Sequence, residues 1–179
     1  MIEMKRHIRE RVRGLRLLPF YLFTFLLFLA ACTSIDCPVE NLVYTNYELR
    51  KADGTVDTLN ADSVWIWTKR ADGSDTLLIN GLCGSSATKF SLQISYTDPE
   101  DVFVLYMRTP EHTSYLDTFR IKKENYPHFE SVDCQAAYFH KLTATATTHH
   151  ILDSITIQHA NVNYDVSHTH LFIYFKADR

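Results

Sequence analysis

The stretch Thr88-Lys89-Phe90-Ser91-Leu92-Gln93-Ile94-Ser95-Tyr96 decides the fold class of this chain. Phe90, Leu92, Ile94 and Tyr96 alternate with polar residues, so one face of the segment is apolar and the other is polar. This period of two is typical of a β-strand with one face in a core and one in water. Short runs of the same kind, separated by turn residues, fill the chain on both sides.

The alternating runs predict nine strands. They cover residues 42–50, 63–69, 76–80, 88–96, 102–107, 114–121, 135–142, 152–158 and 168–176. Asp72-Gly73 between two apolar runs indicates a tight hairpin, and the run 102–107 is apolar on both faces, which is typical of a central strand. Short strands with frequent turns predict an all-β protein, an antiparallel β-sandwich that is immunoglobulin-like or related, with 8–9 strands after an N-terminal signal helix.

The N-terminus has the three parts of a secretory signal. Six Lys and Arg residues precede an apolar run at 17–29, and Ala30, Ala31 and Cys32 follow it. As a helix, the 13-residue run would span about 20 Å, which is short for a bilayer core of about 30 Å. We therefore expect residues 1–31 to be a removed signal peptide, residues 32–41 a tether, and residues 42–179 a single β-sandwich domain.

Leu29-Ala30-Ala31-Cys32 resembles the lipobox of bacterial lipoproteins. This resemblance implies cleavage before Cys32 and attachment of diacylglycerol to its sulfur, which would tether the mature protein to a membrane. An ordinary signal peptide with a chance cysteine is the alternative.

Charge and cysteine content narrow the classes of partner and compartment. Six of 18 basic and two of 21 acidic residues lie in 1–31, so the mature chain has 12 basic and 19 acidic residues and a net charge of −7. Such a chain is a poor ligand for nucleic acid.

Export permits disulfides, and we expect Cys37 to pair with Cys134 and leave Cys83 free. The alternative is three free thiols.

Two pairs of aromatic residues are candidates for a ligand surface: Trp65 with Trp67, and Phe172 with Tyr174. The alternative is that loops cover both pairs. His168 and His170 are also candidates, as metal ligands. However, pairing Ile155 and Ile157 with the core face of Leu171, Ile173 and Phe175 turns both histidines away from His159. We therefore predict no metal site and no cofactor, and expect the double change His168→Ala, His170→Ala to leave stability nearly unchanged.

Several local patterns resemble an uncharacterised family of Bacteroidota lipoproteins. They are the lipobox, Ile35-Asp36-Cys37-Pro38, the Asp-Ser-Val and Asp-Thr-Leu strand starts at 62–64 and 75–77, and Ser131-Val132-Asp133-Cys134 before Phe139-His140. The resemblance implies location and fold but no chemistry. Thr33-Ser34-Ile35-Asp36 is a poor match to the acidic surface-export signal of such bacteria, which favours the periplasmic face of the outer membrane.

These observations predict a non-enzymatic envelope lipoprotein that binds another envelope protein. The sequence has no nucleophile elbow, phosphate loop or dinucleotide fingerprint. The second hypothesis is a module that binds a glycan or small ligand through the aromatic pairs, and the third is a hydrolase. Trp65 and Trp67 in a concave groove would favour a glycan, and a flat apolar patch would favour a protein.

Overall fold

The computed structural model describes residues 42–70, 72–83 and 86–177, together with Phe23 and Cys37, and for Cys83 it describes the backbone alone. The chain divides into two units, Met1–Cys37 and Pro38–Arg179, and the second holds every described strand. Within these described ranges, no helix is long and apolar enough to cross a membrane.

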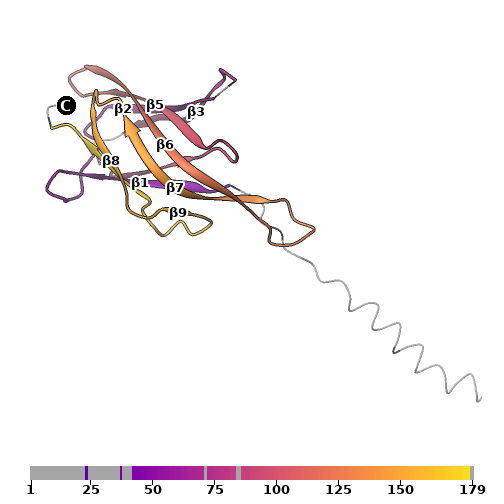
Figure 1. The fold of residues 1–179 in the computed structure, drawn as a ribbon. Helices are drawn as coiled ribbons and strands as arrows, with labels where there is room; N and C mark the ends of the chain where they lie inside the picture. The colour runs from indigo at the N-terminus through magenta and orange to yellow at the C-terminus, as the bar shows by residue number, and fades with distance from the viewer. Residues whose placement is uncertain (1–22, 24–36, 38–41, 71, 84–85, 178–179) are drawn as a thin grey trace, which may run out of the picture. The chain divides into compact units, whose positions relative to one another are not determined.

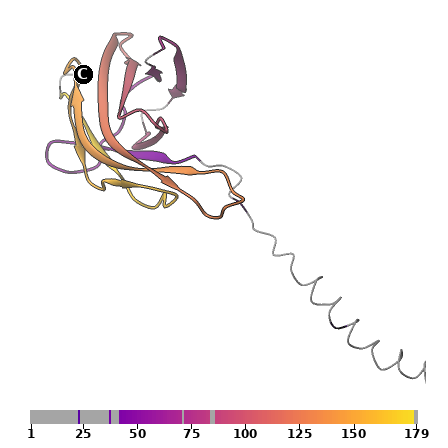
Figure 2. The same cartoon turned by 45° about the vertical axis from the view of Figure 1, so that its right-hand side comes forward.

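The second unit is a β-sandwich, as predicted. The strands are β1 (Tyr44–Arg50), β2 (Ser63–Lys69), β3 (Asp75–Cys83), β4 (Lys89–Gln93), β5 (Glu100–Arg108), β6 (Ser114–His128), β7 (Ala137–Thr147), β8 (Leu152–Ile157), β9 (Asn161–Val162) and β10 (Leu171–Phe175). One sheet has the order β4-β1-β10-β8 and the other β3-β2-β5-β6-β7-β9 (Figures 1 and 2).

Alternation along each strand builds one core between the two sheets. Tyr47 and Leu49 of β1, Phe103 and Leu105 of β5, and Phe119 of β6 are among its fully buried side chains. As predicted, β5 is central: it pairs with β2 on one side and β6 on the other. All the described strand pairs are antiparallel except one, since β1 and β10 run parallel.

The turn chemistry is as predicted. Gly73, in the β2–β3 hairpin, has a φ of 81°, which glycine adopts without steric strain. The Asp72 carboxylate accepts hydrogen bonds from the backbone N–H and the hydroxyl of Ser74. Asp53-Gly54-Thr55 repeats the arrangement, with Gly54 at a φ of 83°.

The structure departs from the predicted strand boundaries in several places; for example, β3 and β7 run on to Cys83 and Thr147, past the predicted ends at 80 and 142, and β10 begins at Leu171 and not at 168. The predicted strand 88–96 ends at Gln93 because the Ser95 N–H donates to the Asp101 carboxylate, and Tyr96, predicted to be in the core, is exposed. Strand β6 runs past 121 to His128, and β9 was not predicted. Pro127 is compatible with the longer β6 because residues beyond Lys122 pair with β7 alone, so its missing N–H lies on a free edge.

Candidate functional site

The two predicted tryptophans lie on the outer face of the six-stranded sheet. Val64 and Ile66 of β2 are buried in the core, so Trp65 and Trp67, which alternate with them, point away from the second sheet. Both are half-buried. Neither lines the depression at Tyr174, the cleft at Asp101 or the hollow at His168.

Apolar neighbours extend this face into a patch. In the sheet register, Trp65 lies opposite Tyr106, and Trp67 lies opposite Val104 and Leu77, while Leu116 lies opposite Tyr106. Residues opposite one another in antiparallel strands share a face. We call these six residues the outer-sheet patch: Trp65, Trp67, Leu77, Val104, Tyr106 and Leu116. Leu77 is 49% exposed and Leu116 55%, whereas Val104 is covered.

Phe172 and Tyr174 point outward from β10, as predicted, but they lie on the outer face of the other sheet. The structure therefore does not bring the two aromatic pairs together. The Arg50 guanidinium lies 4.6 Å from the centre of the Phe172 ring, an arrangement typical of a cation–π contact. Tyr174 lines a broad depression of about 990 Å³ with Asp53, Asp153 and Lys176 among its other residues.

Charged side chains dominate this second face. The Glu48 carboxylate is 5% exposed and contacts Arg50, the Lys89 ammonium at 2.7 Å and the Thr169 hydroxyl at 3.2 Å. The hydrogen bond from Lys89 is the main reason that the pKa of Glu48 is lowered. Because Arg50 already covers Phe172, this face offers a partner less free aromatic surface than the outer-sheet patch.

The histidine prediction is wrong in its geometry. The register of β8 with β10 is as expected, with Ile157 opposite Leu171 and Ile155 opposite Ile173. However, the N–H groups of both Gln158 and His159 donate to the His170 carbonyl, which places two residues opposite one. Such a bulge ends the alternation. The His159 ring consequently stacks on that of His168, with 4.4 Å between their centres, and lies 6.0 Å from that of His170.

His170 is a buried structural residue, 1% exposed, rather than a surface ligand. Its Nδ1 accepts the backbone N–H of Asn46 at 3.0 Å, and the Asn46 side chain donates to the carbonyls of Val166 and His168. Burial, with His159 and His168 nearby, lowers the pKa of His170 to about 4. The premise that both side chains are exposed is therefore wrong. Removing His170 would leave a backbone donor unpaired, so we now expect His168→Ala, His170→Ala to lower stability. Among the described residues, no group of three or more potential ligands is arranged to hold a metal ion.

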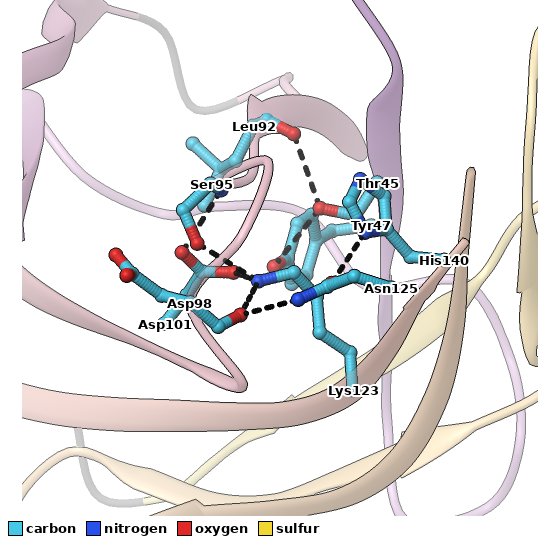
Figure 3. Close-up of polar contacts among 9 residues, drawn as sticks. All are labelled: Thr45, Tyr47, Leu92, Ser95, Asp98, Asp101, Lys123, Asn125 and His140. Carbon is cyan, nitrogen blue, oxygen red and sulfur yellow. Dashed lines mark hydrogen bonds and ion pairs between the residues drawn. The ribbon is translucent and has the colours of Figure 1, made fainter. Parts of the chain in front are cut away.

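A buried ion pair that the sequence analysis missed links the neighbouring strands β5 and β6 to the connection between β4 and β5 (Figure 3). The Lys123 side chain is 0% exposed, and its ammonium donates to the Asp101 carboxylate at 2.6 Å, the Asp98 carbonyl at 2.7 Å and the Ser95 hydroxyl at 2.9 Å. An ammonium has three donors, so all three are used. This amine is therefore a structural cation and not an available nucleophile.

His140 extends the network from β7. Its Nδ1 lies 2.7 Å from the Asn125 side-chain oxygen, and the Asn125 amide donates to the Asp98 carbonyl at 3.1 Å (Figure 3). Because the Asn125 oxygen can only accept, Nδ1 of His140 carries the proton. Burial, with the Lys123 charge as the second cause, lowers the pKa of His140 to about 4. The imidazole is therefore neutral at neutral pH.

A cleft of about 500 Å³ opens beside this network. Ser95, Asp98 and Asp101 line one part of it, and Tyr96 and Tyr138 line another, with their rings stacked 5.8 Å apart. The carboxylate and hydroxyl groups that face Lys123 thus lie at the inner wall of a cavity. This cleft therefore combines aromatic rings with a buried polar network.

A second buried carboxylate, Asp117, lies on β6 and is 1% exposed. One of its oxygens accepts the backbone N–H groups of His150, Ile151 and Leu152 at 2.8–2.9 Å, and the other contacts the Thr118 N–H and the Thr148 hydroxyl. Burial alone would raise the pKa of Asp117, but these hydrogen bonds outweigh it and lower the pKa. The carboxylate fixes the connection between β7 and β8.

The cysteines follow the prediction where the structure describes them. Cys37 and Cys134 form a disulfide. Cys32 and the signal segment 1–31, apart from Phe23, lie outside the described residues, as does the side chain of Cys83. The predicted lipidation, signal cleavage and free thiol therefore stay predictions.

The chain belongs to a family of unknown function, DUF6452, whose sequence model matches residues 63–175. These bounds run from the start of β2 to the end of β10. No curated protein and no solved structure matches the chain. The family membership agrees with the resemblance to an uncharacterised family and assigns no chemistry.

Proposed function

We propose that this member of the DUF6452 family is a non-enzymatic envelope lipoprotein, anchored through Cys32, that binds another envelope protein through the outer-sheet patch. The observation that carries the proposal is the form of the patch. Trp65 and Trp67 lie among Leu77, Tyr106 and Leu116 on the open face of a sheet, outside the described cavities. Tryptophan and tyrosine are enriched in protein interfaces, where they contribute much of the binding energy.

The contrast with the other face supports this choice. There, Phe172 already packs under Arg50 and the carboxylate of Glu48 already has three partners, so a ligand would have to displace existing contacts. On the outer-sheet patch, Leu77 and Leu116 expose about half of their surface to solvent. Covering such apolar side chains releases about 25 cal/mol per Å² of buried area.

Anchoring is supported by the lipobox and by the basic and apolar segments before it. Metabolic labelling with a palmitate analogue tests it. The wild-type protein should carry the label, and Cys32→Ala should lose it. An unlabelled wild-type protein would reject the lipoprotein, and with it the membrane anchor, the removed signal peptide and the location on the periplasmic face of the outer membrane.

In-cell photo-crosslinking tests the protein interaction. A photoreactive side chain at Leu116 should form a discrete adduct with another envelope protein, and adding Trp67→Ser should abolish it. The matched control is the same group at Lys89, whose side chain is 63% exposed on the opposite face. Equal adducts from both positions, or none from Leu116, would contradict the proposal.

A small-ligand or glycan function is the second candidate, and the cleft beside Asp101 favours it. Its volume of about 500 Å³ is within the usual range of ligand sites, about 300–1,000 Å³. The stacked pair Tyr96 and Tyr138 could hold an apolar ring face. Screening sugars and small carboxylates for an increase in melting temperature, with Tyr138→Ala as the control, distinguishes this function from the first.

A further inference from the structure

The tip of the β6–β7 hairpin exposes large apolar side chains that no described contact covers. Phe129 is 63% exposed and Val132 98% exposed, and Tyr126 near the end of β6 is also exposed. These residues lie at or beside the loop 129–136 that joins the two strands. Isolated exposed apolar residues are ordinary, but three within seven positions at the end of one hairpin form an exposed apolar cluster, which is typical of an interaction site.

Strand pairing and aromatic packing hold the hairpin in a defined conformation up to its tip. Strand pairing continues to the last residues, Tyr126 with Phe139 and His128 with Ala137. Behind the tip, the Phe139 ring stacks on His128 at 4.2 Å and meets Tyr164 edge-on at 5.1 Å. Both views show the hairpin extending past the neighbouring strands (Figures 1 and 2). The tip is therefore placed away from the core and from the outer-sheet patch.

The disulfide places the same loop close to the lipid anchor in covalent terms. Cys134 is part of loop 129–136 and is bonded to Cys37, which lies five residues after Cys32. Five fully extended residues span at most about 18 Å. With acyl chains on Cys32, the length of this segment limits how far Cys134 can lie from the membrane surface. The exposed apolar side chains of the loop are therefore held near a bilayer.

We propose that the hairpin tip inserts into the membrane interface, with Phe129 and Val132 among the upper acyl chains and Tyr126 at the level of the headgroups. This inference rests on the proposed lipidation of Cys32. Aromatic side chains are favoured at the interface because they combine an apolar body with a polar edge. Glu124 precedes the tip, and Glu130 and Asp133 lie within it, so charge favours a zwitterionic over an anionic surface. The tip and the acyl chains would then hold the protein at two points and fix its orientation.

Depth-dependent fluorescence quenching of the full lipidated protein tests the insertion. Phe129→Trp, and separately Val132→Trp, are reconstituted in vesicles of phosphatidylcholine and phosphatidylethanolamine with or without brominated acyl chains. Bromine quenches tryptophan only within contact range, so each variant should lose its added emission in brominated vesicles. Leu116→Trp is the matched control, an exposed apolar position on the outer-sheet patch, and its added emission should persist.

Each outcome decides between the two proposals. Palmitate-labelled protein with unquenched tryptophan at 129 and 132 overturns the insertion and leaves the lipoprotein intact. Equal quenching of Leu116→Trp also overturns it, because the protein would then adhere without a preferred face. A protein without the palmitate label rejects the anchor and the insertion together. Unchanged melting temperatures of the three variants verify that the fold is retained.

Discussion

Strand β6 buries two charged residues, one at each end of its inward-facing segment 117–123, and the two charges are stabilised in different ways. Asp117 and Lys123 flank Phe119 and Ile121, and all four are buried. Lys123 has an opposite charge, Asp101, together with one carbonyl and one hydroxyl. Within the described part of the chain, the hydrogen-bond partners of Asp117 include no cation and are backbone N–H groups and threonine hydroxyls.

The difference shows which segments each buried charged residue connects to β6. The Lys123 pair ties β6 to the start of β5 and to the turn at 95–98, which are side by side through tertiary packing. Asp117 instead orders the 148–152 connection by filling the hydrogen-bonding needs of a loop backbone. The buried charge of Lys123 is stabilised by the opposite charge of Asp101. The buried charge of Asp117 is stabilised by neutral hydrogen-bond donors and does not depend on a second charged residue.

Breaking the ion pair should have the largest effect. Lys123→Met leaves the Asp101 carboxylate buried without its cation, and we expect a loss of about 3–5 kcal/mol in the free energy of unfolding. Urea denaturation measures it, with Lys122→Met on the exposed side of the strand as the control. Adding Asp101→Leu to Lys123→Met should recover most of the loss, and failure to recover would show that the pair is not the reason.

Neutralising the other end should cost less. Asp117→Asn keeps the shape of the side chain but replaces one acceptor oxygen with an NH₂ group, which is a donor and would face other donors. We expect a loss of about 3 kcal/mol in the free energy of unfolding. Hydrogen exchange should show faster exchange of the Ile151 and Leu152 amides than in the wild type, while the Ser95 amide is unaffected. Equal acceleration at Ser95 would mean that the two ends are not independent.

Acid should weaken the two ends in different pH windows. The pKa of His140 beside Lys123 is about 4 in the folded state, against about 6.5 for an unperturbed histidine. A base whose folded pKa is lowered loses stability as pH falls from its unfolded toward its folded value. We therefore expect a loss of about 2 kcal/mol between pH 7 and 4.5 from this end.

The buried His170 adds a loss of the same sign in this window, since its pKa is also lowered to about 4. Asp117, whose pKa is lowered, loses its contribution only as pH falls below the usual carboxyl range. Denaturation at stepped pH, with His140→Gln compared with the wild type, separates the effects. A variant that keeps the full wild-type slope above pH 4.5 would contradict the assignment.

The smallest effect should come from one hydroxyl at the Asp117 end. Thr148→Val removes a hydrogen bond to the Asp117 carboxylate while the backbone N–H groups remain, so we expect a loss of about 1 kcal/mol. Thr143→Val, at an exposed position of β7, is the matched control. A loss as large as that of Asp117→Asn would show that the hydroxyl, and not the amides, holds the carboxylate.

The sequence by itself determined the sandwich, the central position of β5, the β2–β3 hairpin, the outward direction of Phe172 and Tyr174, and the common face of Trp65 and Trp67. These features follow from local rules, because alternation sets the face of a side chain and Asp-Gly sets a turn. The same alternation through Phe119 and Ile121 points Asp117 and Lys123 inward, so a signal for both buried charges was present in the sequence.

Only the tertiary structure decided what those side chains meet. That Asp101 faces Lys123, that loop amides surround Asp117, and that Arg50 covers Phe172 while the tryptophans stay partly open depend on contacts between segments far apart in the chain. The histidines show the reason most clearly. A single bulge at Gln158 and His159, stabilised by two hydrogen bonds to the His170 carbonyl, reverses which face His159 occupies. The alternation of apolar and polar residues does not indicate where such an extra residue is inserted.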